Sequence, residues 1–142
     1  MTDQETAMNE KLLDVEELYL GKNMNCAEST LRYIDEKAQL GIGTDDLRII
    51  GGFGAGMGCG KTCGALAAGI AAISALLIEE RAHDVPGFRG ICADYVARFE
   101  KEFGGTDCAE LKKKYFREGV RCAELVNANA ELLESFLEEL RG

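Results

Sequence analysis

The chain has 142 residues, of which 46% are hydrophobic and 29% charged, and its net charge is −9 at pH 7. This length is enough for one domain with its own core, and we expect residues 1–142 to form a single helical, cysteine-containing redox domain. The acidic balance argues against nucleic acid and against membrane insertion or an anionic membrane surface, because nucleic acids and anionic lipids select clustered Lys and Arg.

The first half of the chain is predicted to form helices separated by short turns. Apolar spacing predicts a first helix over about 3–20 with a stop near Gly21. A second helix is predicted to start after Asn23 or Asn25, which are favoured cap residues, and to end near residue 39. A glycine-containing turn at 41–43 precedes a short helix that Thr44 caps.

A glycine-rich segment, residues 51–60, interrupts this pattern. Six of its ten residues are glycine, so we expect an irregular loop that approaches its neighbours closely. The next 16 apolar residues, 63–78, are fewer than the roughly 20 that a membrane span needs, so we expect a buried core helix over about 61–81.

Three more helices are predicted over about 86–103, 107–116 and 120–140. Pro86 suits the start of the first, and glycines at 104–105 end it. The basic run Lys112-Lys113-Lys114 is interpreted as a solvated helix face. No stretch alternates like a strand, so the predicted fold class is all-α, a bundle of about six or seven helices with the glycine-rich loop before the central core helix.

Six cysteines are more than core packing requires. The first residues lack the basic and apolar regions of a signal peptide, so we expect a cytoplasmic protein, where stable disulfides are rare. Cysteines in that compartment are more often ligands or catalysts. We therefore interpret them as the functional site.

Four cysteines lie near predicted helix starts: Cys26, Cys63, Cys108 and Cys122. Free N–H groups and the positive end of the helix dipole can lower the pKa of a thiol there, and the thiolate is the form that binds metals and attacks disulfides. We predict these four as metal ligands, brought together from distant helices. Cys59, four residues before Cys63, is a candidate additional ligand.

The other candidate residues are weaker. The glycine-rich loop could present backbone N–H groups to a cofactor at Gly56, Gly58 and Gly60. Cys92 lies inside a predicted helix and is interpreted as core packing. The only histidine, His83, is interpreted as a solvated loop residue.

Familiar motifs do not fit. The chain has no C-x-x-C pair and no compact ferredoxin-type cysteine run. Residues 55–62 end like a phosphate-binding loop, but Ala55 replaces the first glycine and no strand is predicted before it, so nucleotide binding is not predicted.

The cysteines and the glycine-rich loop together resemble the C_GCAxxG_C_C family of redox-active proteins, which are small bacterial and archaeal helical domains. The resemblance covers about residues 15–140, and its pieces are 25–28, 51–58, 63–65, 103–108 and Cys122. The family's four cysteines correspond to the four predicted ligands. One departure is Ala68, followed by Gly69, where the family pattern has glycine. The resemblance implies a helical fold and redox activity.

Three functions remain as hypotheses. The leading one is an iron–sulfur cluster on the four cysteines that exchanges electrons with a redox partner protein. The second is thiol–disulfide chemistry without a cofactor, with Cys63 and either Cys26 or Cys59 as the catalytic pair. The third is a structural zinc module. The Ala- and Gly-rich core helix could also pack against a second copy in a homo-oligomer.

Overall fold

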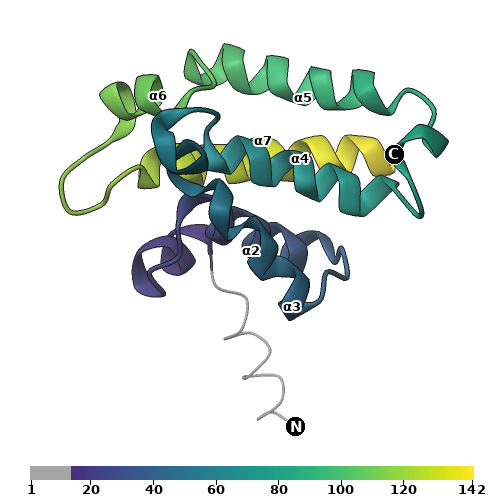
Figure 1. The fold of residues 1–142 in the computed structure, drawn as a ribbon, viewed down its shortest axis with the longest axis horizontal. Helices are drawn as coiled ribbons and strands as arrows, with labels where there is room; N and C mark the ends of the chain where they lie inside the picture. Colours follow the sequence, from purple (N-terminus) through teal and green to yellow (C-terminus); the bar gives the residue numbers. More distant parts are fainter. Residues whose placement is uncertain (1–13) are drawn as a thin grey trace, which may run out of the picture.

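The computed structural model describes residues 14–142, and every regular element in that range is a helix (Figure 1). The predicted all-α fold class is thereby confirmed. The predicted helix over 3–20 lies largely outside the described residues, and its end at Gly21 matches the first element. The elements in chain order are η1 (Glu17–Gly21), α2 (Cys26–Ala38), α3 (Thr44–Leu47), η2 (Arg48–Phe53), η3 (Gly56–Gly60), α4 (Gly64–Leu77), η4 (Ala82–Asp84), α5 (Phe88–Phe103), α6 (Cys108–Tyr115) and α7 (Ala123–Arg141).

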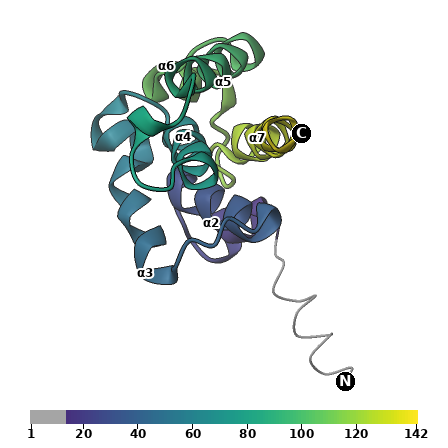
Figure 2. The same cartoon turned by 90° about the vertical axis from the view of Figure 1, so that its right-hand side faces the viewer.

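Helix α4 lies at the centre of the bundle and contacts α2, α5 and α7. In Figure 1, α5 lies above α4 and α7, while α2 and α3 lie below them, and Figure 2 shows α4 and α7 side by side. Alanine and glycine dominate α4, so its neighbours can pack close to its backbone. Within residues 14–142, no helix combines the length and the apolar character needed to cross a bilayer.

Backbone conformation explains where the helices begin later than predicted. The predicted helix over 86–103 starts at Phe88 because Gly87, with φ of 71°, has a left-handed conformation that a right-handed helix cannot include. The last helix starts at Ala123 rather than near residue 120 for the same reason, since Arg121 has φ of 51°. Helix α4 starts at Gly64 rather than near residue 61, with three residues between it and the glycine-rich segment.

The glycine-rich segment has two parts. Residues 51–53 are the second half of the 3₁₀ helix η2 (Arg48–Phe53), a regular element where the sequence predicted an irregular loop. Four successive residues then have positive φ: Ala55 at 56°, Gly56 at 63°, Met57 at 60° and Gly58 at 75°. A Cβ on Gly56 would lie 2.6 Å from the Cβ of Cys108, so this position requires glycine. The predicted irregular, close-packed loop is confirmed here.

A buried polar contact joins the first turn of α4 to two other helices. The Tyr95 hydroxyl of α5 donates to Asn129 Oδ1 of α7 over 2.6 Å, and Asn129 Nδ2 donates to the carbonyl oxygen of Ala65 over 3.2 Å. Gly69 makes room for this tyrosine, because a Cβ there would lie 2.5 Å from ring atoms. Gly69, directly after Ala68, therefore supplies a close approach between α4 and α5.

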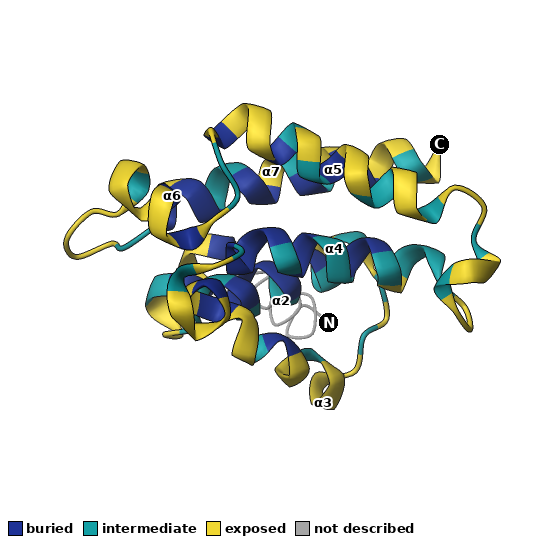
Figure 3. Cartoon of the chain, turned by 45° about the horizontal axis from the view of Figure 1, so that its top comes forward, coloured by how far each residue is buried: buried dark blue, intermediate teal, exposed yellow. Residues whose placement is uncertain are grey.

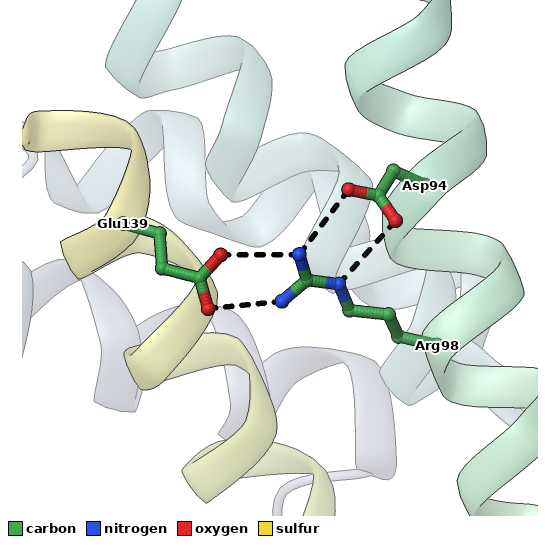
Figure 4. A network of polar contacts seen from close by, with 3 residues as sticks. All are labelled: Asp94, Arg98 and Glu139. Atoms are coloured by element: carbon green, nitrogen blue, oxygen red, sulfur yellow. Dashed lines mark hydrogen bonds and ion pairs between the residues drawn. The ribbon is translucent and has the colours of Figure 1, made fainter.

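An exposed ion-pair network joins α5 and α7 away from the first turn of α4 (Figure 4). Arg98 donates to both carboxylate oxygens of Glu139, over 2.9 and 3.1 Å, and to both of Asp94, over 3.3 Å each. Its guanidinium also lies 4.8 Å from the centre of the Phe136 ring. Hydrogen bonds from Arg98 lower the pKa of Glu139.

Candidate functional site

The four predicted cysteines occupy equivalent positions at the starts of four helices. Cys26 and Cys108 are the first residues of α2 and α6, and Cys63 and Cys122 are the cap residues directly before α4 and α7. Their predicted place at helix starts is confirmed. The first N–H groups of a helix have no partner within the helix, so each cysteine lies beside free donors and the positive end of a helix dipole.

A capping box fixes Cys26. Asn25 accepts a hydrogen bond from the backbone N–H of Glu28 over 2.9 Å, and the Glu28 carboxylate accepts one from the Asn25 N–H over 3.0 Å. The Asn25 amide also donates to the carbonyl oxygen of Gly51 over 2.9 Å. The start of α2 is therefore tied to the glycine-rich segment.

Backbone pairing places Cys63 beside Cys108. The N–H of Cys63 donates to the carbonyl oxygen of Thr106 over 2.8 Å, and the N–H of Cys108 donates to that of Lys61 over 2.5 Å. The segments before α4 and α6 thus form an isolated antiparallel bridge. Two helices far apart in the sequence begin side by side as a result.

Tyr19 of η1 holds the fourth cysteine. Its hydroxyl accepts a hydrogen bond from the backbone N–H of Cys122 over 3.1 Å, and its carbonyl oxygen accepts one from the Arg121 guanidinium over 2.8 Å. The same guanidinium lies 4.2 Å from the centre of the Tyr19 ring. The left-handed backbone at Arg121 and these contacts together set where α7 begins.

All four cysteines line one pocket of about 160 Å³. Cys26 lies against the first residue of α4, since a Cβ on Gly64 would be 2.7 Å from its Sγ. Among residues 14–142, no Asp, Glu or His lines this pocket. The remaining lining residues are Tyr19, Asn25, Ala55, Leu111, Lys112, Phe116, Arg121, Leu125 and Val126.

Burial controls the charge state of the Cys63 thiol. Loss of solvent, and after it the nearby Cys26 sulfur, raise the pKa of Cys63 to about 12. The backbone N–H groups of Leu66 and Ala65 lower this pKa but do not compensate for burial. At neutral pH the metal-free Cys63 is a thiol.

Two other pocket thiols behave in the same way. Burial is the largest cause that raises the pKa of Cys108 and of Cys122, and the Lys112 ammonium lowers both. The expectation that a helix start lowers the thiol pKa is therefore wrong for these two and for Cys63. Neighbouring residues identify the helix starts, but they do not reveal how far the thiols are removed from water.

The pocket nevertheless has positive character. Helices α4, α6 and α7 have no side-chain hydrogen bond capping their first turns, so first-turn N–H groups remain available to an anionic group. Lys112 and Arg121 line the pocket, and neither pairs with a carboxylate within residues 14–142. Negative charge held by the four sulfurs would be stabilised by these groups.

The structure does not bring Cys59, Cys92 or His83 into the pocket. Cys59 is exposed in η3, and its thiol lies 3.7 Å from the carbonyl oxygen of Gly56. Cys92 is half-buried on α5 and packs against the hydrophobic core, as predicted. His83 is exposed on η4, also as predicted.

The three glycines predicted as cofactor donors do not line the pocket either. Gly56 is buried against Cys108, Gly58 faces open space, and a Cβ on Gly60 would lie 3.3 Å from that of Ala109. Of the glycine-rich segment, only Ala55 lines the pocket. The segment shapes the wall behind Cys108 through close packing.

Sequence reasoning missed three polar residues of the pocket. Lys112 is exposed, as the prediction of a solvated face required, but its position one helical turn after Cys108 also places it on the pocket wall. Arg121 is adjacent to Cys122 and could have been noticed for that reason. Tyr19 had no such signal, because it reaches the site from an element more than 100 residues away.

A comparison with protein families supports this grouping. The family model described as "Putative redox-active protein (C_GCAxxG_C_C)" matches residues 24–136, which contain all four pocket cysteines. No curated protein and no solved structure matches the chain. The matched range includes every pocket-lining residue except Tyr19.

Proposed function

Because the chain belongs to the C_GCAxxG_C_C family of redox-active proteins, we propose that it transfers electrons through an iron–sulfur centre held by Cys26, Cys63, Cys108 and Cys122. The observation that carries this proposal is the convergence of four cysteines from four helices on one pocket. Cysteine thiolates are the usual ligands of [2Fe–2S] and [4Fe–4S] clusters. Such a cluster, when bound, supplies reversible one-electron chemistry.

The donor set and the size of the pocket support a cluster. Four cysteine sulfurs from four helices line the pocket, and cysteine thiolates ligate both iron–sulfur clusters and structural zinc. A cavity near 150 Å³ accommodates a group as large as benzene. Within residues 14–142, no group of three or more His, Cys, Asp or Glu side chains is arranged to hold a metal ion, so a bound centre would require the sulfurs to rearrange.

The surrounding residues would stabilise the charge of such a centre. Ligation removes the thiol protons that burial otherwise retains, so the four sulfurs bring negative charge into the pocket. Lys112 and Arg121 lie on its wall to balance that charge, together with the first-turn N–H groups. Leu125 and Val126 add apolar surface that limits water access, and both solvent exposure and hydrogen bonding tune a cluster's potential.

A second candidate function, thiol–disulfide exchange, is favoured by one observation. The Cys26 sulfur lies against Gly64, the residue directly after Cys63. In this reaction two thiols lose two electrons and two protons to form the disulfide, and a substrate disulfide is reduced to two thiols. Attack would start from Cys26, because buried Cys63 stays protonated at neutral pH. Cys59 lies outside the pocket and is the weaker partner.

The deciding experiment is purification without oxygen, followed by assays of iron and acid-labile sulfide and by an absorption spectrum. Iron and sulfide in similar amounts, with visible absorption, are expected. Serine variants at each of the four pocket cysteines should lose the chromophore. Cys59→Ser and Cys92→Ser are the matched controls and should keep it.

A metal-free, colourless protein would reject the cluster. The disulfide function would then predict loss of two titratable thiols on mild oxidation, with peptide mapping placing the bridge between Cys26 and Cys63. Stoichiometric zinc without sulfide would instead support the structural zinc module.

A further inference from the structure

Charge is segregated along this chain. Residues 112–121 contain five of the 16 Lys and Arg residues and one of the 25 Asp and Glu residues, so this segment carries +4 and the rest of the chain −13. The segment covers the end of α6 and the connection to α7. That connection projects from one end of the bundle and is largely exposed (Figures 1 and 3). We call residues 112–121 the basic rim.

The basic rim borders the cysteine pocket. Lys112, Phe116 and Arg121 belong to the segment and also line the pocket. Phe116 is 44% exposed and Val120 39%, so apolar side chains lie among the cations. Aromatic residues and arginine in this combination are enriched in protein–protein interfaces.

Internal ion pairs do not neutralise the rim. Lys113 lies 3.4 Å from Glu110, and Arg117 lies 3.6 Å from Glu124, but all four side chains are more than half exposed. Exposed pairs of this kind exchange readily with other partners. These two cations are therefore available to an incoming carboxylate.

Hydrogen bonds within the rim order the turn between α6 and α7. The N–H of Arg117 donates to the carbonyl oxygen of Arg121 over 2.9 Å, and the Arg117 guanidinium donates to that of Lys114 over 2.9 Å. A preordered surface loses less conformational entropy when a partner binds.

We propose that the basic rim is the docking face for an acidic one-electron carrier protein, an inference that rests on the proposed electron-transfer function. The +4 rim attracts an acidic face, while the −13 remainder repels it, so encounter is directed to the end of the molecule that holds the pocket. One electron passes between the docked carrier and the centre, one being oxidised as the other is reduced. The exposed Phe116 and Val120 supply apolar contact area that a small anion would not need.

Charge-reversal variants test the proposal on the full-length protein. Lys113→Glu with Arg117→Glu reverses two rim charges that do not line the pocket. Lys37→Glu with Arg48→Glu reverses two exposed charges on α2 and η2, and both double variants have the same net charge of −13, four below the −9 of the wild type. Calorimetry would measure binding of an acidic plant-type ferredoxin as the probe, with basic cytochrome c as the opposite probe.

The acidic probe should bind the wild type, and the rim variant should bind it about 10-fold or more weakly at low salt, while the control variant changes by less than about twofold. The difference should shrink near about 0.5 M salt. The proposal would be overturned if both variants lost affinity for the ferredoxin equally, or if the wild type did not bind the ferredoxin. It would also be overturned if the wild type bound cytochrome c or duplex DNA more strongly than the ferredoxin. The calorimetric assay measures binding and does not require electron transfer. If this protein binds the ferredoxin through the basic rim but contains no iron or sulfide, the proposed electron-transfer function is rejected and the docking face is not.

Discussion

Replacement of Gly69 by alanine tests whether the buried contact behind the cysteine pocket is as close as the structure shows. The new Cβ would lie 2.5 Å from ring atoms of Tyr95, which is fully buried and cannot move away freely. Overpacking of this kind costs about 1–3 kcal/mol. Displacement of the tyrosine hydroxyl would also leave the Asn129 amide oxygen unpaired, at about 1–3 kcal/mol. The higher helix propensity of alanine relative to glycine offsets about 1 kcal/mol of this destabilisation.

The expected net loss for Gly69→Ala is about 2–4 kcal/mol, which would lower the urea midpoint by about 1–2 M. Gly90→Ala is the matched control, because Gly90 also lies inside a helix but a Cβ there meets nothing within 4 Å. That variant should gain about 0.5 kcal/mol. Urea titration followed by circular dichroism gives both values. A Gly69→Ala protein as stable as the wild type would refute the packing argument.

Three further predictions concern individual side chains. Alkylation of the metal-free protein at pH 7 should modify exposed Cys59 first and Cys63 last, because burial raises the pKa of Cys63 to about 12. Mass spectrometry gives the order of modification, and early modification of Cys63 would contradict its burial. The pKa of Glu139 is lowered, so its ion pair with Arg98 stabilises the fold at pH values above the ordinary pKa of 4.5, and this stabilisation is lost as the pH falls. In urea titrations, Glu139→Gln should therefore lose less stability than the wild type between about pH 5 and 3. An equal loss in both proteins would show that the pair contributes nothing. Gly64→Ala places a Cβ 2.7 Å from Cys26 Sγ, so it should reduce the iron content of a cluster-bearing protein without loss of helix content. Unaltered iron content would show that the Cys26 sulfur can move freely.

Much of the fold could be predicted because helix signals are local. Asn25 and the glutamate three residues later form the capping box that the sequence favours, and Gly104 ends α5 with φ of 87° as a C-terminal glycine does. The errors occur where a single residue has an unexpected backbone conformation. Arg121 delays the start of α7 through its left-handed φ, and it also contacts Tyr19, a residue about 100 positions away that no local pattern contains.

The same distinction between local signals and long-range contacts applies to the candidate site. Cys26, Cys63, Cys108 and Cys122 were identified because a helix start can be recognised from neighbouring residues, and the structure brings all four to one pocket. The backbone pairing that places α4 beside α6 joins residues more than 40 positions apart and leaves no pattern in the sequence. The sequence could not distinguish the roles of the glycine-rich loop, because glycine serves equally for ligand contact and for close packing. Gly56 serves the second purpose, against the Cβ of Cys108.

The opposition between burial and helix dipoles gives the proposed centre its physical logic. Burial raises the pKa of Cys63, Cys108 and Cys122, although each lies at a helix start that favours negative charge. A lone thiolate on any of these three cysteines is unfavourable, so in the metal-free site these three are protonated thiols that are slow to react. Metal ligation removes those protons and concentrates negative charge where N–H groups, Lys112 and Arg121 can stabilise it. Charge balance therefore predicts that iron binding releases protons and that the affinity for iron increases as the pH rises through neutrality. A site of preformed thiolates would instead bind iron with little dependence on pH. Potentiometric titration of the protons released during reconstitution distinguishes protonated thiols from preformed thiolates.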